Sequence, residues 1–169
     1  MITTERLVLR RPELRDFEAY ATMWSHPEVL RHISTEPFSE EMIWGRFLRQ
    51  AGGWLYMGFG YFVMEEKESG QFVGQIGFQD LHRDLTPSLI GTMEAGWTLH
   101  PTAHGKGYAS EAAAAVFQWA EENFSGQRIT CIIAPENIPS LKIAAKMQMR
   151  EFARSTYHGK PVIMMERHL

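Results

Sequence analysis

Residues 97–112 of the chain read WTLHPTAHGKGYASEA, and this stretch is the most informative part of the sequence. An apolar strand that ends at Leu99 passes through Pro101 into a glycine-lysine-glycine turn, residues 105–107, and the turn opens onto an alanine-rich helix. This order directs several backbone N–H groups and the positive end of a helix dipole towards one point in space. The stretch therefore predicts a strand, a turn and a helix that together bind a phosphate or diphosphate.

The composition indicates one ordinary globular domain over residues 1–169. A chain of 169 residues is long enough to bury a core without support from disulfides or a metal. Hydrophobic residues make up 44% and charged residues 22%, which is close to average globular usage. The net charge is −3 and the chain has no basic tract, so we do not expect nucleic acid as a partner.

The sequence also predicts a compartment. The single cysteine, Cys131, lies in an apolar run and has no second cysteine to pair with, as is usual in a reducing environment. The first residues lack the pattern of a signal peptide, and no segment has about 18 uninterrupted apolar residues. We therefore expect a cytoplasmic protein without a membrane partner.

Hydrophobic periodicity and turn residues predict the order of the secondary structure. We expect strands over residues 6–10, 60–66, 71–79, 93–99 and 128–133, helices from about residues 16, 39, 107 and 137, and a closing hairpin that turns at residues 158–159. The resulting order, β-α-α-β-β-β-α-β-α-β-β, predicts a single α/β domain with a mixed sheet.

The second of these helices has clear expected ends. Ser39 is a suitable N-cap, and the glycine pair at residues 52–53 is expected to end the helix. The buried stripe of this helix is expected to contain Met42, Ile43, Phe47 and Leu48.

Two familiar phosphate-binding loops do not fit the turn at residues 105–107. A P-loop requires Gly-x-x-x-x-Gly-Lys-Ser/Thr, but His100 takes the first glycine position and Gly107 replaces the hydroxyl residue that would bind magnesium. A dinucleotide-binding loop requires Gly-x-Gly-x-x-Gly and an acidic residue at the end of the next strand. Here Ser110 replaces the third glycine, and residues 131–134 read CIIA without an acid.

The turn resembles the acyl-CoA loop of the GNAT superfamily of N-acetyltransferases, whose pattern is Arg/Gln-x-x-Gly-x-Gly/Ala. Gly107 and Ala109 fit the end of this pattern, while His104 takes the usual Arg/Gln place. Residues 4–10 (TERLVLR), residues 107–112 (GYASEA) and the spacing of Asn137 and Ser140 are similar to the RimJ/RimL-like branch. The resemblance spans about residues 4–150 and implies the GNAT fold, an α/β domain with a central, mostly antiparallel sheet flanked by helices.

The resemblance also implies how acetyl-CoA binds. Main-chain N–H groups of the loop would cradle the diphosphate, and these belong to Gly105, Lys106, Gly107, Tyr108 and Ala109. Because such contacts are largely main-chain, we expect the loop to tolerate His104. The main chain around Trp97 and Leu99 would pair with the pantetheine arm, and one of those amides would stabilise the oxyanion, while both side chains are expected in the core.

Acetyl transfer to an amine also needs a base for the amine and a proton for the leaving thiolate. Glu94 lies on the polar face of its strand near the expected thioester, so it is a candidate general base, directly or through water; the alternative is a solvated strand glutamate. Many relatives place a tyrosine seven residues after the asparagine, where this chain has Ala144. RimL-like members use the serine at the position of Ser140, so Ser140 is a candidate acid or CoA contact. Asn137 is a candidate pantetheine contact. For both residues, the alternative role is helix capping.

No metal is expected. His100 and His104 are four residues apart, but Pro101 between them disfavours a helix and no glutamate follows His100 as in a zinc protease. Acceptor specificity is expected in the loops at residues 26–60 and 82–92. Tyr157 and His158 are read either as part of the acceptor side or as exposed turn residues.

We therefore expect an acetyl-CoA-dependent N-acetyltransferase in which a primary amine, of a peptide N-terminus or a small molecule, attacks the thioester directly in a ternary complex. The alternatives are an acyltransferase that uses another acyl-CoA and an acyl-CoA-binding module without catalysis. The sequence does not identify the acceptor. A homodimer is compatible with the sequence, although no residue pattern indicates one.

Overall fold

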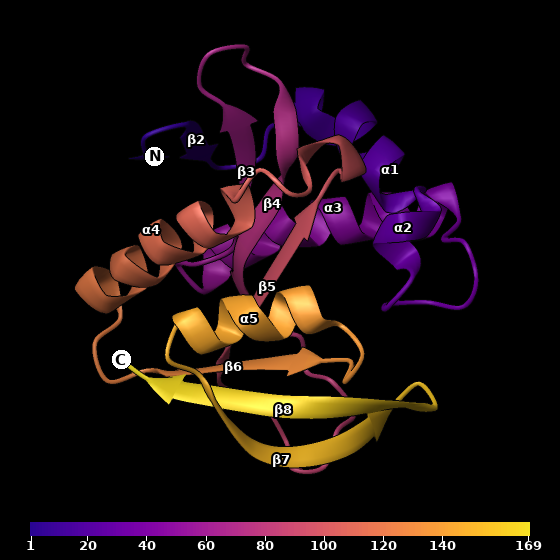
Figure 1. Cartoon of the computed structure of the whole chain (residues 1–169), viewed down its shortest axis with the longest axis vertical. Helices are drawn as coiled ribbons and strands as arrows, with labels where there is room; N and C mark the ends of the chain where they lie inside the picture. Colours follow the sequence, from indigo (N-terminus) through magenta and orange to yellow (C-terminus); the bar gives the residue numbers. More distant parts are fainter.

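The computed structural model describes residues 1–169, which form one eight-stranded sheet with helices on both faces (Figure 1). The strands are β1 (Ile2–Thr3), β2 (Leu7–Arg10), β3 (Tyr61–Glu66), β4 (Phe72–Gln79), β5 (Met93–Leu99), β6 (Arg128–Ile133), β7 (Arg150–Tyr157) and β8 (Lys160–His168). Their order across the sheet is β1-β2-β3-β4-β5-β6-β8-β7, and all neighbours are antiparallel except β5 and β6. The predicted mixed and mostly antiparallel sheet is confirmed.

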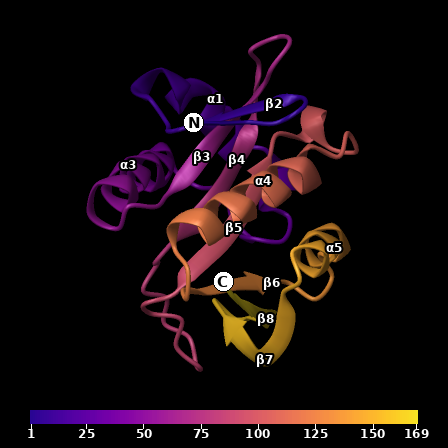
Figure 2. The ribbon, with the colours of Figure 1, turned by 90° about the vertical axis from the view of Figure 1, so that its left-hand side faces the viewer.

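The helices lie in two layers. They are α1 (Phe17–Trp24), α2 (Pro27–Leu30), α3 (Glu40–Tyr56), α4 (Tyr108–Asn123) and α5 (Ile138–Lys146), with short 3-10 turns η1 (Leu14–Asp16) and η2 (Pro101–Ala103). Figure 2 shows α1 and α3 on one face of the sheet and α4 and α5 on the other. None of the helices has the length and the apolar character needed to span a bilayer.

The predicted order of elements is confirmed, with two short additions, β1 and α2. The helix caps expected from the sequence are also present. Ser39 Oγ accepts a hydrogen bond from the Met42 N–H at 3.2 Å, and Asn137 Oδ1 accepts one from the Ser140 N–H at 3.2 Å. Both helices therefore begin where their local sequence dictates.

The predicted end of α3 is wrong, because the helix continues through the glycine pair to Tyr56. Trp54 holds this last turn against the sheet. Its ring packs edge-on against Phe62 with a centroid distance of 4.8 Å, and its Nε1 donates to the main-chain oxygen of Tyr61 at 3.0 Å. Tertiary packing thus outweighs the low helix propensity of two glycines.

The buried face of α3 also differs from the prediction. Ile43 and Phe47 are buried as expected, but Met42 and Leu48 are 51% and 48% exposed. A polar residue, Gln50, is buried instead, because its Nε2 donates to Gln75 Oε1 on β4 at 2.6 Å. The helix therefore turns a polar edge towards the sheet at this point.

On the other face, α4 lies close to the sheet because its inner residues are small. Ala112, Ala113 and Ala120 have no exposed surface. Further along this face, Phe117 packs edge-on against Phe78 of β4 at a centroid distance of 5.5 Å. This packing fixes the first turn of α4, and with it the glycine turn, relative to β5.

The N-terminal segment braces the same turn. Glu111 accepts hydrogen bonds from Thr4 Oγ1 at 2.6 Å and from the Arg6 main-chain N–H and Nε at 2.8 Å each. Arg6 Nη1 in turn donates to the main-chain oxygen of Lys106 at 2.9 Å. The motifs at residues 4–10 and 107–112 are therefore two halves of one contact.

We expect Glu111→Gln to lower the free energy of unfolding at pH 7 by about 1.5–3 kcal/mol, because it weakens hydrogen bonds to a charged group. Burial raises the pKa of Glu111, but the hydrogen bonds from Thr4 and Arg6 outweigh burial and keep this pKa below its usual value. The stabilisation should therefore be present above the unfolded-state pKa of about 4.3 and disappear as the pH falls through the lower folded-state pKa. Urea denaturation over a pH series measures both effects.

Glu122→Gln is the matched control, since Glu122 lies on the same helix and its carboxylate accepts a single side-chain hydrogen bond, from Gln118. We expect this control to change stability by no more than about 0.5 kcal/mol. Equal stabilities of the two variants at pH 7 would contradict the brace.

Candidate active site

The sheet opens between β5 and β6. Their pairing is limited to two positions, Met93 with Ile129 and Glu94 with Thr130, after which the strands have no further paired residues. A cavity of about 510 Å³ lies at this opening. Its lining comes from β5, β6, α3, α5, the loop after β4 and the β7–β8 turn, so the site draws on distant parts of the chain.

The register of β5 leaves main-chain groups free at this opening. In an antiparallel pair, every second residue of a strand hydrogen-bonds to its neighbour. His100 N, just after β5, donates to Val73 O at 2.9 Å, so the even-numbered residues of β5 are the ones that hydrogen-bond to β4. The N–H and C=O groups of Trp97 and Leu99 therefore point away from β4 and towards the gap beside β6. The Leu99 carbonyl is bonded by His104 Nε2 at 3.1 Å. The other groups lack a strand partner, which is unusual for a central strand.

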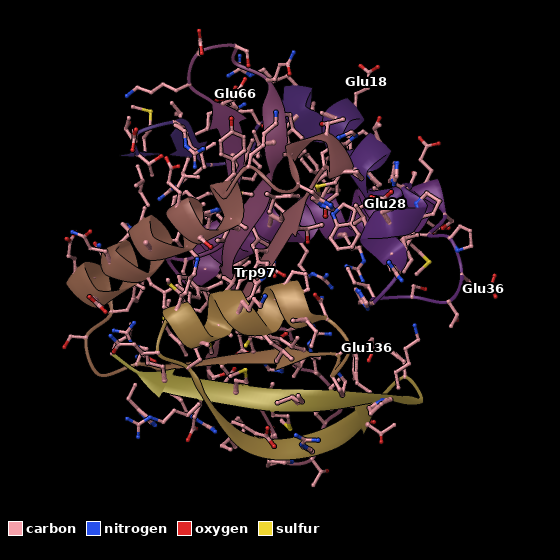
Figure 3. All side chains as sticks on the ribbon, in the orientation of Figure 1. Glu18, Glu28, Glu36, Glu66, Trp97 and Glu136 are labelled. Carbon is pink, nitrogen blue, oxygen red and sulfur yellow. The ribbon has the colours of Figure 1, made fainter.

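The indole of Trp97 spans this opening. Figure 3 shows the residue between the ribbons of β5 and α5, where its Nε1 donates to Ser140 Oγ at 3.1 Å. The side chain of Trp97 packs against the main core, as expected, but it is only partly buried and also lines the cavity. Asn137 and Ser140 line the same cavity, and Asn137 also caps α5, so a capping role and a ligand role are compatible.

The glycine turn has the geometry expected for binding an anion. Gly105 and Gly107 adopt left-handed conformations with φ of +75° and +81°. Gly107 is the N-cap of α4 and provides no side-chain cap, so the first N–H groups of the helix are left for a ligand. A Cβ at Gly105 would meet no atom within 4 Å, so the turn is open at this point.

Side chains around the turn have structural contacts. The buried Tyr108 donates its hydroxyl hydrogen bond to Glu66 and lies under the guanidinium of Arg6, 4.7 Å from the ring centroid. Lys146 Nζ donates to Ser110 Oγ at 3.2 Å, which brings a positive charge to the first turn of α4. The side chain of Tyr108 is therefore engaged within the protein.

Glu94 is not the solvated strand residue of the alternative interpretation, since only 5% of its surface is exposed. It lines the cavity and accepts hydrogen bonds from Arg83 Nε at 2.7 and 2.9 Å. Burial raises the pKa of Glu94, and the positive charge of Arg83 opposes this rise without cancelling it. Glu94 therefore exchanges its proton at a higher pH than an ordinary glutamate does.

Sequence reasoning missed Arg83, which lies in the loop between β4 and β5. This loop is anchored by Leu85 and Leu89, which are buried together with Val162 and Met164 of β8. The guanidinium lies over the ring of Tyr157 at 4.8 Å from its centroid. The contact could not be read from the sequence because it depends on a hairpin about 75 residues further along the chain.

Tyr157 and His158 both belong to the cavity lining, and His158 is at the same time an exposed residue of the β7–β8 turn, as the alternative interpretation expects. The tryptophans of the helical region before the first hairpin lie in different surroundings: Trp24 packs with residues of α3 and lines the cavity, whereas Trp54 belongs to the main core. Trp44 and Tyr56 are exposed.

The two histidines of the turn act locally. His100 Nδ1 lies 2.8 Å from Thr102 Oγ1 and accepts from the Thr102 N–H, which caps η2. The described residues contain no group of three or more His, Cys, Asp or Glu side chains placed to hold a metal ion.

Comparisons with known proteins agree with this arrangement. Residues 6–150 match the acetyltransferase (GNAT) domain family. The chain is 32% identical to the uncharacterized N-acetyltransferase YnaD of Bacillus subtilis, in an alignment that covers 88% of this chain and 82% of YnaD. Its fold matches an acetyltransferase from Agrobacterium tumefaciens with a TM-score of 0.83 and 28% identity, over 99% of this chain and 94% of the other.

The fold is also similar to that of yncA from Salmonella typhimurium, solved with its cofactor acetyl-CoA, with a TM-score of 0.74, 18% identity and coverage of 97% and 94% of the two chains. The chain belongs to the GNAT acetyltransferase family, and it is an acetyltransferase. GNAT acetyltransferases use acetyl-CoA as the donor.

We expect Gly107→Ala to weaken CoA binding by about tenfold or more, since an alanine side chain strains the left-handed N-cap and disturbs the N–H groups behind it. Isothermal titration calorimetry with CoA measures the change. Gly126→Ala is the matched control, because Gly126 has almost the same φ, +82°, and a Cβ there meets no atom within 4 Å.

Both variants should lose similar stability, but only Gly107→Ala should lose affinity for CoA. Wild-type affinity of Gly107→Ala, or an equal loss in both variants, would count against this turn as the cofactor loop.

Proposed function

We propose that the chain is an N-acetyltransferase that moves the acetyl group of acetyl-CoA to a primary amine by direct attack in a ternary complex. The observation that carries this proposal is the meeting, in one cavity, of a buried carboxylate and the unpaired main chain of β5. A carboxylate can accept the proton of an attacking amine, and an amide N–H can stabilise the oxyanion of the tetrahedral intermediate.

The reaction balances without an oxidant or a metal. The neutral amine nitrogen forms a bond to the acetyl carbon, and the carbon–sulfur bond of the thioester then breaks. One proton leaves the nitrogen and one proton reaches the thiolate, so the products are an N-acetyl amine and free CoA. The protein has to supply a proton acceptor, a proton donor and an oxyanion site.

Glu94 is the proposed proton acceptor, directly or through a water molecule, and Arg83 is the proposed positioning residue. The two Arg83 hydrogen bonds fix the orientation of the carboxylate in the cavity. The burial that raises the pKa of Glu94 also makes it a stronger base than a solvated carboxylate.

The oxyanion and the thiolate are assigned to β5 and α5. We assign the oxyanion to the main-chain N–H of Trp97 or Leu99, which the β5 register directs into the opening. Ser140 Oγ accepts from the Trp97 indole, so its own hydroxyl hydrogen is free to be donated to the thiolate or to CoA. Asn137 is the proposed pantetheine contact, because it lines the cavity beside Ser140.

Three finer points stay predictions. The first is the RimJ/RimL-like branch, which rests on the motifs at residues 4–10, 107–112 and 137–140. The primary amine as acceptor and the direct attack in a ternary complex are the other two. Release of free thiol from acetyl-CoA over a panel of amines tests the acceptor class: CoA binding without thiol release for any amine would contradict acetyl transfer onto an amine.

We expect Glu94→Gln to lower kcat/KM by about 10²–10⁴-fold, because it removes the proton acceptor without a large change in shape. In the wild type, kcat/KM should rise with pH as Glu94 loses its proton, and the midpoint of this rise should lie above the pKa of an ordinary glutamate. This ascending limb of the pH profile should vanish in Glu94→Gln, which leaves only the deprotonation of the amine substrate. An unchanged rate and profile would exclude Glu94 as the base.

Arg83→Met tests the coupling between the two residues. Arg83 lowers the pKa of Glu94, so its removal should raise this pKa further and move the ascending limb to higher pH. A fall in rate without any movement of the limb would indicate that Arg83 serves only to fold the loop.

A further inference from the structure

The cavity carries more positive charge than the rest of the protein. Its charged lining residues are Arg46, Arg49, Arg83 and Lys160 against a single acid, Glu94. The whole chain has the opposite balance, with 17 basic and 20 acidic residues. None of the residues of the glycine turn lines this cavity, so the excess of cations is separate from the expected diphosphate site.

Three of these cations lack an ionic partner. Arg83 is paired with Glu94, but Arg46, Arg49 and Lys160 have no carboxylate oxygen within 4 Å. Arg46 and Arg10 are both half-buried, but Arg10 is paired with Asp16 and Glu65, whereas Arg46 has no such pair. A partly buried guanidinium without an anion is unfavourable unless a ligand supplies the charge.

Arg46 is also held in place before any ligand binds. Its guanidinium lies over the rings of Phe38 and Trp24, at 4.4 and 4.8 Å from their centroids. Such stacking restricts the conformations of the Arg46 side chain before a ligand binds, so less conformational entropy is lost on binding. Burial lowers the pKa of Arg46, and the charges of Arg49 and Arg83 act in the same direction, so an anion bound here would relieve their repulsion.

Arg46 and Arg49 of α3 lie on the face of the sheet towards which the side chain of Glu94 points. Glu94, Gly96 and Thr98 share one face of the strand, and Gln75, which pairs with Thr98, is hydrogen-bonded to Gln50 of α3. The arginines of α3 and the carboxylate of β5 therefore face each other across the acceptor side of the cavity, while Trp97 and the cofactor elements lie on the other side.

We propose that the acceptor is a compact primary amine that carries an anionic group, such as the carboxylate of an amino acid, and that Arg46 and Arg49 bind this group while Glu94 receives the proton of the amine. This inference rests on the proposed N-acetyltransferase function and names its substrate class. The same cations would disfavour a protonated ammonium near them and so favour the neutral, nucleophilic amine. A polyamine, which has only positive charges, would be repelled.

The test compares acceptors that differ only in charge. Thiol release from acetyl-CoA is measured with each of the standard amino acids and with its amide, and with taurine and aminomethylphosphonate to distinguish carboxylate from other anions. Spermidine and an amidated tripeptide represent the acceptors without an anion. We expect at least one anionic amine to exceed its uncharged counterpart by about tenfold or more in kcat/KM.

Arg46→Met should lower the ratio of kcat/KM for the acid to that for its amide by about 10- to 100-fold, and Arg46→Lys should restore part of the ratio. A purely structural defect would lower both values alike and leave the ratio unchanged. Arg150→Met is the matched control, because Arg150 is exposed on β7, has no ion pair and does not line the cavity.

Each outcome decides something. Turnover of spermidine or the tripeptide in preference to every anionic amine, or an acid-to-amide ratio that Arg46→Met does not change, overturns this inference and leaves the N-acetyltransferase proposal intact. CoA binding without thiol release for any member of the panel overturns the proposed function, and the inference with it.

Discussion

The site depends on the parting of β5 and β6 after two paired residues. Each strand is paired on its other side, β5 through six residue pairs with β4 and β6 through six with β8, and these pairings hold the two strands apart. Main-chain donors and acceptors in the middle of a sheet are thereby left without partners, which is costly unless a ligand supplies them. The extended arm of a cofactor that can hydrogen-bond to a strand suits this edge, as it would any strand with an open side.

A single strand separates the two halves of the reaction. Because successive side chains of β5 point to opposite faces, Trp97 reaches Ser140 on the α5 side while Glu94 reaches Arg83 on the α3 side. In the proposed reaction, the donor and the acceptor would approach the same main chain from two directions without sharing a binding surface. The arginine-rich part of the cavity, in a protein that is acidic as a whole, lies on the Glu94 side.

The glycine turn and most element boundaries could be predicted because they are set by neighbouring residues. Strand β6 has the predicted bounds, and Ser39 and Asn137 cap helices as expected, since a cap acts over three residues. The end of α3 could not be predicted, because the local signal of two glycines is outweighed by the packing of Trp54 on the sheet. The polar contact of Gln50 with β4 was hidden for the same reason, since its partner lies 25 residues away.

By itself, the sequence determined the α/β order, the glycine turn at the start of α4 and the placing of Glu94 on the polar face of its strand, all of which depend on local spacing. Ser140 became a candidate through the resemblance to RimL-like members. Only the tertiary structure decided that Glu94 is buried against Arg83 and that Arg46 stands unpaired across the cavity. Charge balance and burial are properties of groups that meet through long-range packing. The periodicity of a single chain segment carries no information about them.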